Sequence, residues 1–343
     1  MVVVCGLRKF SVLINKLKIN RNQLEYVSNI KVVAILMVVF LHSVSPLFYK
    51  LGQVSMGRWY VTVFYDSFVR CCVPLFLIIS GVTVLNKDYK PKDWFINKIL
   101  KRLFLPFLFY FLITVFLNQR PLISFFHLSE IGYWFPFFGI ILTLYLIYPI
   151  IRIWLKNTPI FWIYYIVIIW FISMVLNFWI PTWTLFSTNV IYGYVGFPIL
   201  GYLISKINTK KFKYIGLLIY IASSLLIFYL TISFSLNKTT YTEKYFTYLS
   251  PLVILMSIGL FVFIKNINFI FKNKKIVLVR NFLSSHTYGI YFLHPLIISR
   301  FYYLHNIIHP VYSDWIIFFI GIFTTSFIIY FLTKIPILKK IVG

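Results

Sequence analysis

The sequence predicts an all-α, polytopic membrane protein: a bundle of about ten transmembrane helices with both termini in the cytoplasm. Of the 343 residues, 61% are hydrophobic and only 12% are charged. A soluble domain is close to half apolar and about a quarter charged, so the apolar side chains here exceed what a soluble core buries. The surplus places them against lipid, and the length suits one bundle.

Ten apolar stretches lie between clusters of charge, and a helix needs about 20 apolar residues to cross the bilayer core. We expect the spans near residues 29–49, 60–85, 103–118, 133–152, 159–180, 189–205, 214–236, 248–265, 284–303 and 314–334, of which the third is short. Runs such as "LIYPIIRIWL" lack the alternating polar residues of a membrane β-barrel. We therefore divide the chain into a basic cytoplasmic segment, 1–28, and a membrane domain, 29–338.

The positions of the basic residues agree with this layout. Of the 33 lysines and arginines, 26 fall in predicted cytoplasmic segments, six fall in predicted outer segments, and Arg70 falls inside a span. This asymmetry is the one that the positive-inside rule requires. The net charge of +26 therefore indicates topology and contact with anionic lipids, and we expect no nucleic-acid partner. The three cysteines have no metal-binding spacing, and we expect no metal.

The segment "KVVAILMVVFLHS" (residues 31–43) carries an ionisable residue near each end of an apolar run. Lys31 and His42 are eleven residues apart, which places them on one helix face and about 16 Å apart along the axis. A lysine at the rim can extend to the interface. A histidine inside a span is costly and usually faces protein or a water-filled cavity. From this residue alone, a structural imidazole and a catalytic one are both open.

The same segment resembles the first-helix signature of the acyltransferase type 3 family, bacterial membrane enzymes that O-acylate cell-surface and secreted polysaccharides. In that family a basic residue, usually arginine, precedes a histidine by eleven positions, and an aspartate often lies three residues before the arginine. These positions hold Lys31, His42 and Ser28 here. Lysine binds a phosphate as a point charge, whereas arginine binds it with two donors.

The resemblance continues along nearly the whole chain. Further segments resemble family motifs in the family's order: "VRCCVPLFLIISGVTVLNK" (69–87), "NKILKRLFLPFLFY" (97–110), "YWFPFFGIILTLYLIYPIIR" (133–152), "YVGFPILGYLIS" (194–205) and "SSHTYGIYFLHPLII" (284–298). The match is closest to compact members of the family that lack an extra soluble domain.

The resemblance implies a cytoplasmic acyl-CoA donor, a hydroxyl acceptor, usually a sugar, and a place in the bacterial cytoplasmic (inner) membrane. Acetyl-CoA would be a co-substrate, and no cofactor would be bound permanently. His42 would be the general base, while Lys31, Lys101 and Arg102 would bind the phosphates of CoA. Lys101 and Arg102 also obey the positive-inside rule, so they could determine topology without binding CoA. No acidic residue of the first span can orient His42, so we expect a hydroxyl, amide or carboxylate from another helix.

Several in-span polar residues are candidates for an acceptor site or a cavity wall: Asp66, Arg70, Ser80, Tyr288, Tyr291 and His294. Each has a structural alternative. Asp66 and Arg70 have i,i+4 spacing, which is typical of an ion pair. Small residues such as Ser80 allow close helix approach. The other three share one helix face and could form a polar packing seam. Glu130, Glu243 and Asp314 are expected to be solvated in outer loops.

The leading functional hypothesis is a membrane O-acyltransferase, in the simplest case an acetyltransferase for a cell-surface glycan or its lipid-linked precursor. Two alternatives belong to other classes: a transporter or flippase for lipid-linked glycan, and a non-catalytic subunit of a polysaccharide export system. The expected partners are acyl-CoA, the glycan acceptor, membrane lipids and proteins of polysaccharide biosynthesis or export.

Overall fold

The structure is a computed structural model that describes residues 2–118, 135–180, 193–238, 240–267 and 273–342. Helices make up 83% of it, and the described residues contain no strand. The prediction of an all-α fold is therefore confirmed. The main helices are α1 (Val2–Phe48), α2 (Met56–Val69), α3 (Cys72–Ser80), α4 (Pro91–Asp93), α5 (Leu105–Leu117), α7 (Pro136–Asn157), α8 (Ile160–Trp179), α9 (Gly196–Lys206), α10 (Lys213–Lys238), α11 (Pro251–Asn266), α12 (Lys274–Ser285), α13 (Thr287–Ile298), α14 (Leu304–Ile307) and α15 (Pro310–Leu332).

Eight helical segments within the described residues are long and apolar enough to cross a membrane, so the chain is a multi-pass membrane protein. They are Glu25–Phe48, Met56–Leu85, Pro91–Leu117, Pro136–Asn157, Ile160–Trp179, Lys210–Lys238, Lys244–Asn266 and Pro310–Leu332. Two further predicted spans, 189–205 and 284–303, correspond to the shorter helices α9 and α13. The count of ten and the cytoplasmic position of both termini stay predictions.

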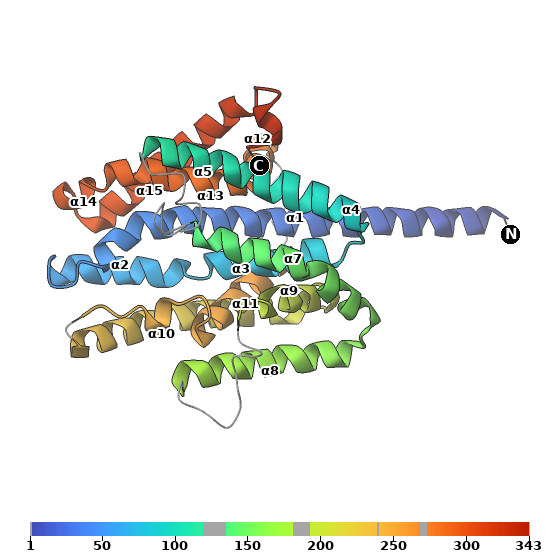
Figure 1. Cartoon of the computed structure of the whole chain (residues 1–343). Helices are drawn as coiled ribbons and strands as arrows, with labels where there is room; N and C mark the ends of the chain where they lie inside the picture. The colour runs from blue at the N-terminus through green and yellow to red at the C-terminus, as the bar shows by residue number, and fades with distance from the viewer. Residues whose placement is uncertain (1, 119–134, 181–192, 239, 268–272, 343) are drawn as a thin grey trace.

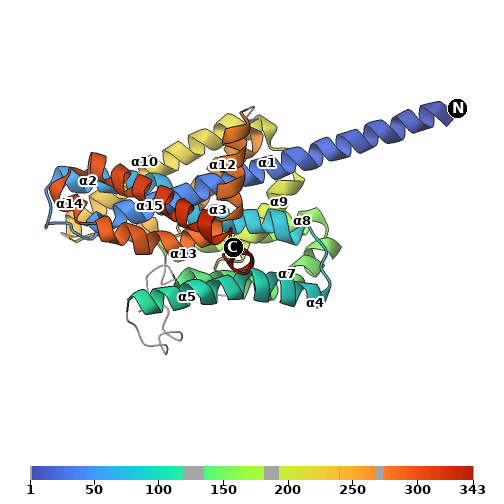
Figure 2. The same cartoon turned by 90° about the horizontal axis from the view of Figure 1, so that it is seen from above.

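Helix α1 runs through the centre of the bundle, and its N-terminal part extends beyond the other helices (Figures 1 and 2). Ile30 and Ala34 belong to one buried core, whereas Ile35 and Val39 belong to a second core on another side of the helix. Because both cores share α1, a residue of α1 can meet helices from both halves of the chain. α1 continues unbroken through residue 28, where we placed the division between the two predicted segments.

The third span is longer than the sequence predicts. Helix continues from Pro91 to Leu117 through α4, the π-helical segment η2 (Trp94–Phe104) and α5. Ile99 and Leu103 are buried while Lys101 and Arg102 are exposed. The basic residues therefore lie on the outward side of a continuous helix instead of marking its beginning.

Prolines inside helices shape the interior of the bundle. A proline has no N–H, so the carbonyl four residues earlier loses its intrahelical donor. In α7 this carbonyl belongs to Tyr145, and the indole N–H of Trp94 donates to it at 3.1 Å. A side chain from another helix thus replaces the missing backbone bond. The prolines inside helices are Pro46, Pro149 and Pro295.

Two glycines bring the second span and α9 into backbone contact. A Cβ added at Gly81 would lie 1.9 Å from the carbonyl oxygen of Pro198, and one added at Gly201 would lie 2.0 Å from that of Ile78. Small residues at such crossings let transmembrane helices approach closely. This contact explains the Ser-Gly pair at residues 80–81 as a packing device.

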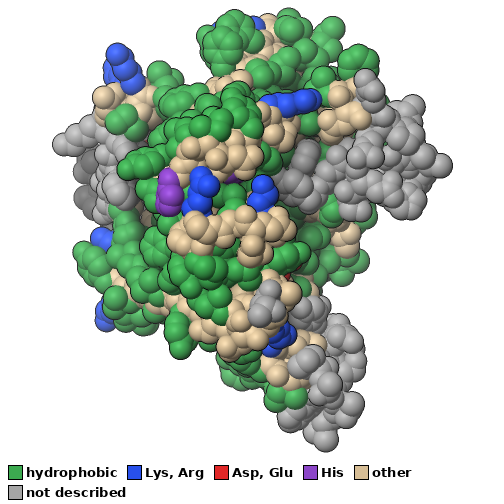
Figure 3. All heavy atoms as spheres, turned by 90° about the vertical axis from the view of Figure 1, so that its left-hand side faces the viewer, with side chains coloured by type: hydrophobic (Ala, Val, Ile, Leu, Met, Phe, Trp, Pro, Cys, Tyr) green, Lys and Arg blue, Asp and Glu red, His purple; other side chains and the backbone are tan. Residues whose placement is uncertain are grey.

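The two ends of the bundle differ from its sides. Helices α4 and α14 lie at opposite ends in Figure 1. The end near α14 shows a few lysine and arginine side chains among hydrophobic and neutral polar ones (Figure 3). The outward faces of α7 and α8 are almost entirely apolar, with only 22% of each span buried inside the protein. These sides are the surfaces that lipid covers.

Candidate active site

Two imidazoles meet in the interior of the bundle, one from α1 and one from α13. Nδ1 of His42 lies 2.7 Å from Nε2 of His294, and the ring planes differ by 5°. His294 is fully buried, and His42 is 8% exposed. The contact joins residues 252 positions apart in the chain.

A backbone carbonyl fixes the protonation pattern of this pair. Nδ1 of His294 lies 2.8 Å from the carbonyl oxygen of Ile290. That oxygen can only accept, so Nδ1 of His294 donates. In the neutral pair, Nε2 of His294 then accepts from the Nδ1–H of His42. The lone pair of the His42 imidazole consequently lies on Nε2.

The group that orients His42 is an imidazole, which differs from the groups predicted from the sequence. We expected a hydroxyl, an amide or a carboxylate, and the structure provides the imidazole of His294. In the sequence alone, His294 is a separate candidate, for an acceptor site or for a polar packing seam. Both histidines occur in apolar runs, and each is followed within four residues by a proline. This shared sequence pattern is the signal from which a contact between the two histidines could have been predicted.

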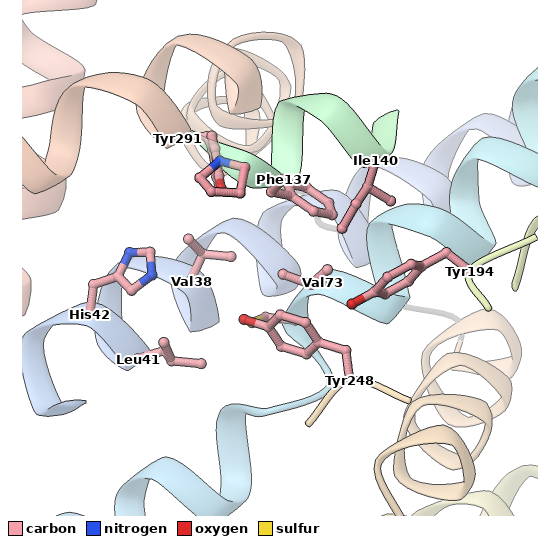
Figure 4. A pocket seen from close by; sticks show the side chains of 11 residues that line it. Val38, Leu41, His42, Val73, Phe137, Ile140, Tyr194, Tyr248 and Tyr291 are labelled. Carbon is pink, nitrogen blue, oxygen red and sulfur yellow. The ribbon is translucent and has the colours of Figure 1, made fainter. Parts of the chain in front are cut away.

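His42 lines a cavity of about 180 Å³ beside this pair (Figure 4). Tyr194 and Tyr248 direct their hydroxyl oxygens into it, and His42 lies at one end. Neither tyrosine is among the predicted site residues. Tyr194 opens the segment "YVGFPILGYLIS", but nothing local indicates a cavity role for it or for Tyr248 among 26 tyrosines. The cavity is lined by Val38, Leu41, His42, Cys72, Val73, Pro136, Phe137, Ile140, Tyr194, Tyr248 and Tyr291.

Basic side chains converge near the other end of the Lys31–His42 stretch. Lys31 is half-buried and lies within electrostatic range of Arg102 and Lys87. Lys98 lies within range of the same two groups. Lys101 is exposed, and its ammonium donates to the side-chain oxygen of Asn97 at 3.2 Å. Lys31 and Arg102 are thus brought together with Lys87, which the sequence analysis did not single out.

Tyr89 lies beside this basic group and is outside the spans. Burial raises its pKa, while Arg102 and Arg152 act in the opposite direction. The guanidinium of Arg152 lies 5.6 Å from the centre of the Tyr89 ring, and the ammonium of Lys98 lies 4.9 Å from it. The aromatic ring therefore lies close to two cations just beyond the C-terminal end of the second span.

Asp66 and Arg70 form an ion pair on the second span. Asp66 is fully buried, and the guanidinium of Arg70 lies 4.2 Å from the centre of the Phe246 ring. Arg70 also lies within electrostatic range of His42 and Tyr248. The contacts of this ion pair are those of a packing interaction, and the pair also lies near two residues that line the cavity, His42 and Tyr248.

The remaining candidates divide between packing and cavity. Ser80 donates to the carbonyl of Leu77 at 2.6 Å and accepts from the hydroxyl of Tyr148 at 2.5 Å. Tyr288 donates to the carbonyl of Leu103 at 2.9 Å. Both tie helices together and neither lines the cavity, whereas Tyr291 does line it.

The expectation for Asp314 was wrong. This residue is fully buried inside α15, and one carboxylate oxygen lies 3.4 Å from Nδ1 of His305. Helix α15 begins at Pro310, four residues before the expected start of the span, so Asp314 is inside the bundle. Glu243 is exposed, as expected. Glu130 lies outside the described residues, and so does Trp134, which belongs to the "YWFP" motif.

The comparison with known families agrees with the sequence motifs. The sequence model of the acyltransferase domain family matches residues 24–334, which is nearly the whole chain. The molecule is a multi-pass helical membrane protein with an imidazole pair at an internal cavity, and it belongs to this acyltransferase family. No curated protein and no solved structure matches the chain significantly.

Proposed function

We propose that this acyltransferase moves an acetyl group from cytoplasmic acetyl-CoA to a sugar hydroxyl of a cell-surface glycan or its lipid-linked precursor. The observation that supports this best is the hydrogen-bonded pair of His42 and His294 at the wall of a cavity. Proteins of polysaccharide biosynthesis or export in the bacterial cytoplasmic membrane would supply the acceptor and remove the product.

His42 acts as the general base in this reaction. Its Nε2 takes the proton from the acceptor hydroxyl while the oxygen attacks the thioester carbonyl carbon. The carbon–sulfur bond then breaks, and the proton passes from Nε2 to the sulfur of CoA. Such proton transfer contributes roughly 10²–10⁴-fold to the rate. His294 holds the imidazole in the required tautomer, because its own Nδ1–H is donated to Ile290.

Negative charge develops on the thioester oxygen during the attack, and a hydrogen-bond donor at that position lowers the barrier. The hydroxyls of Tyr194 and Tyr248 point into the cavity (Figure 4). Tyr248 also lies within electrostatic range of the Arg70 guanidinium. Tyr248 is therefore the better placed of the two to stabilise this oxygen.

The size of the cavity favours a short acyl group. Its volume of about 180 Å³ is below the range of roughly 300–1,000 Å³ that is typical of ligand pockets. An acetyl group and the attacking hydroxyl fit such a space, whereas a long fatty chain does not. The lining beside His42 includes the apolar side chains of Val38, Leu41 and Val73, which suit a methyl group.

The basic side chains near Lys31 suit the phosphates of CoA. The like charges of Lys31, Lys87, Lys98 and Arg102 gather at one end of the Lys31–His42 stretch, and such a group favours a polyanion. The distance of about 16 Å along α1 from Lys31 to His42 would be crossed by the pantetheine arm. Lys101 is a less direct candidate, because it bonds to Asn97.

Membranes that contain the protein, radiolabelled acetyl-CoA and the glycan fraction of the source cells test this function. We expect label to appear in the glycan with the wild-type protein, and the His42→Ala variant to lose this transfer while keeping its thermal stability. The exposed residue His309 provides a control, since His309→Asn should transfer normally. Transfer at the wild-type rate by His42→Ala would exclude the base. A transporter would move unacetylated glycan without any acyl donor.

A further inference from the structure

The turn of α1 that carries His42 lacks one of its backbone hydrogen bonds. Pro46 lies inside α1, four residues after His42. Because Pro46 has no N–H, the carbonyl of His42 loses its intrahelical donor. Ser43 donates its hydroxyl to the carbonyl of Val39 at 2.9 Å, and such back-bonding also bends helices.

Two side chains that follow α13 hold this turn from outside the helix. The hydroxyl of Tyr302 donates to the carbonyl of His42 at 3.0 Å. Nε2 of His305 lies 3.0 Å from the carbonyl of Ser43, and it must donate because a carbonyl oxygen only accepts. The two rings stack at 6.0 Å. Tyr302 and His305 are hereafter called the carbonyl clamp.

The carbonyl clamp is itself held by neighbouring helices. Nδ1 of His305 lies 3.0 Å from the hydroxyl of Ser313 and 3.4 Å from a carboxylate oxygen of Asp314, both on α15. From α2, Arg58 donates to the carbonyls of His305 and Ile308 at 2.9 and 2.7 Å. His305 is only 2% exposed. Two helices, α2 and α15, therefore fix the position of the clamp relative to α1.

We propose that Tyr302 and His305 are positioning residues that set the direction of the His42 imidazole toward the cavity. The inference rests on the proposed function of His42 as the base. His294 holds the imidazole at Nδ1, and the clamp holds the backbone carbonyls of His42 and of the next residue, Ser43. All three contacts come from one continuous stretch, 294–305, so a single piece of chain holds both the imidazole of His42 and the backbone that carries it.

The first test removes one donor and keeps the ring. Tyr302→Phe should lower kcat by about 10²-fold, since a misplacement of about 1 Å has an effect of that size. The KM for acetyl-CoA should not change, because the basic group near Lys31 lies about 16 Å along α1 from His42. Tyr245→Phe is the matched control: the Tyr245 hydroxyl is buried and has no hydrogen-bond partner among the described residues. Wild-type kcat in Tyr302→Phe would overturn the proposal.

A second comparison uses His305. His305→Gln keeps an N–H that can reach the carbonyl of Ser43, whereas His305→Leu has a similar size and no donor. We expect Gln to retain most of the kcat and Leu to lose it. Equal kcat values for the two variants would contradict a role through this hydrogen bond.

A third variant tests whether Tyr302 positions His42 or only supplies a hydrogen bond to the buried carbonyl of His42. In the double variant Pro46→Ala/Tyr302→Phe, the new N–H at residue 46 can bond to the carbonyl of His42 as in a regular helix. Thermal stability should then recover, while kcat stays low because the turn has straightened. Recovery of both quantities would show that Tyr302 only satisfies the carbonyl.

A readout that needs no substrate distinguishes this inference from the proposed function. Diethyl pyrocarbonate modifies imidazoles, and mass spectrometry gives the modification rate at His42. Tyr302→Phe should change this rate several-fold, and Tyr245→Phe should leave it unchanged. Equal rates in wild type and Tyr302→Phe would overturn the positioning role. Failure of the wild-type protein to transfer label would instead overturn the proposed function.

Discussion

His42 and His294 form a nearly coplanar pair in which the Nδ1–H of His42 is donated to Nε2 of His294 over 2.7 Å. The direction of this bond follows from the carbonyl of Ile290, which accepts from the other nitrogen of His294. The arrangement resembles the logic of catalytic triads, in which a third group fixes the tautomer of the base. Here an imidazole takes the place of a carboxylate, so the pair carries no buried charge while both rings are neutral.

Replacing His294 should affect the chemical step more than substrate binding. His294→Leu removes the acceptor for Nδ1 of His42, so the proton can shift to Nε2 and block the base. We expect kcat to fall by about 10²-fold or more, with an unchanged KM for acetyl-CoA. His294→Gln offers a carbonyl oxygen at nearly the same place and should retain more activity. Steady-state kinetics in membranes measures both, and a lower kcat for Gln than for Leu would contradict the role of the acceptor.

Lys31 should act on the binding of acyl-CoA. Lys31→Gln should raise the KM for acetyl-CoA about tenfold, which corresponds to about 1.4 kcal/mol, and change kcat little. Lys31→Arg should keep the KM low, because a guanidinium binds phosphate with two donors. Lys211→Gln removes an exposed lysine from another segment and serves as the control. A tenfold effect in both lysine-to-glutamine variants would indicate general electrostatics in place of a site.

Gly81→Ala should destabilise the fold strongly. The new Cβ would meet the carbonyl of Pro198 at 1.9 Å, and backbone cannot move away as a flexible side chain can. Overpacking of this kind costs about 1–3 kcal/mol or more. Gly57→Ala is the matched control, since nothing lies within 4 Å of its Cβ position. Thermal unfolding in detergent compares the two, and equal melting temperatures would show that the α9 contact is not close in the folded protein.

Stability should fall in weakly acidic solution because of His305, which lies outside the spans. Burial, together with nearby Lys50 and Arg58, lowers the pKa of His305 to about 4, against the effect of its bond to Ser43. Ser313 and Asp314 face the same ring. An unfolded chain binds this proton near pH 6.5, so it binds more protons than the folded state between pH 6.5 and pH 4. Stability must then decrease as pH falls through this range.

The His305→Gln variant isolates this titration. It has no imidazole at this position, so its melting temperature should change less between pH 7 and pH 4.5 than that of the wild type. The difference corresponds to at most about 3 kcal/mol. If the melting temperatures of the variant and the wild type change in parallel with pH, His305 does not control stability in acid.

Much of the molecule was predictable because its chemistry is local. Stretches of about 20 apolar residues can only be buried in lipid or protein, so they predict membrane helices wherever they fold. The spacing of Lys31 and His42 depends on helix geometry alone, and the motifs that follow it indicated the family that the comparison confirms. The predicted catalytic roles of these residues stay proposals.

Burial deep inside the bundle could not be predicted for particular residues. Asp314 stands at the beginning of an apolar run, where a solvated carboxylate is the ordinary expectation. It is buried only because the segment that contains His305 folds over it and α2 packs alongside. The third span also began earlier than expected, because its lysines lie on an outward side that only neighbouring helices define.

The sequence by itself determined the helical class, the membrane environment, the family and the residue proposed as the base. Only the tertiary structure decided which group orients that base, which tyrosines share its cavity and what holds its backbone. Hydropathy and helix periodicity act between residues a few positions apart. The partners of His42 lie more than 250 positions away, and the packing of α1 against α13 and α15 brings them together.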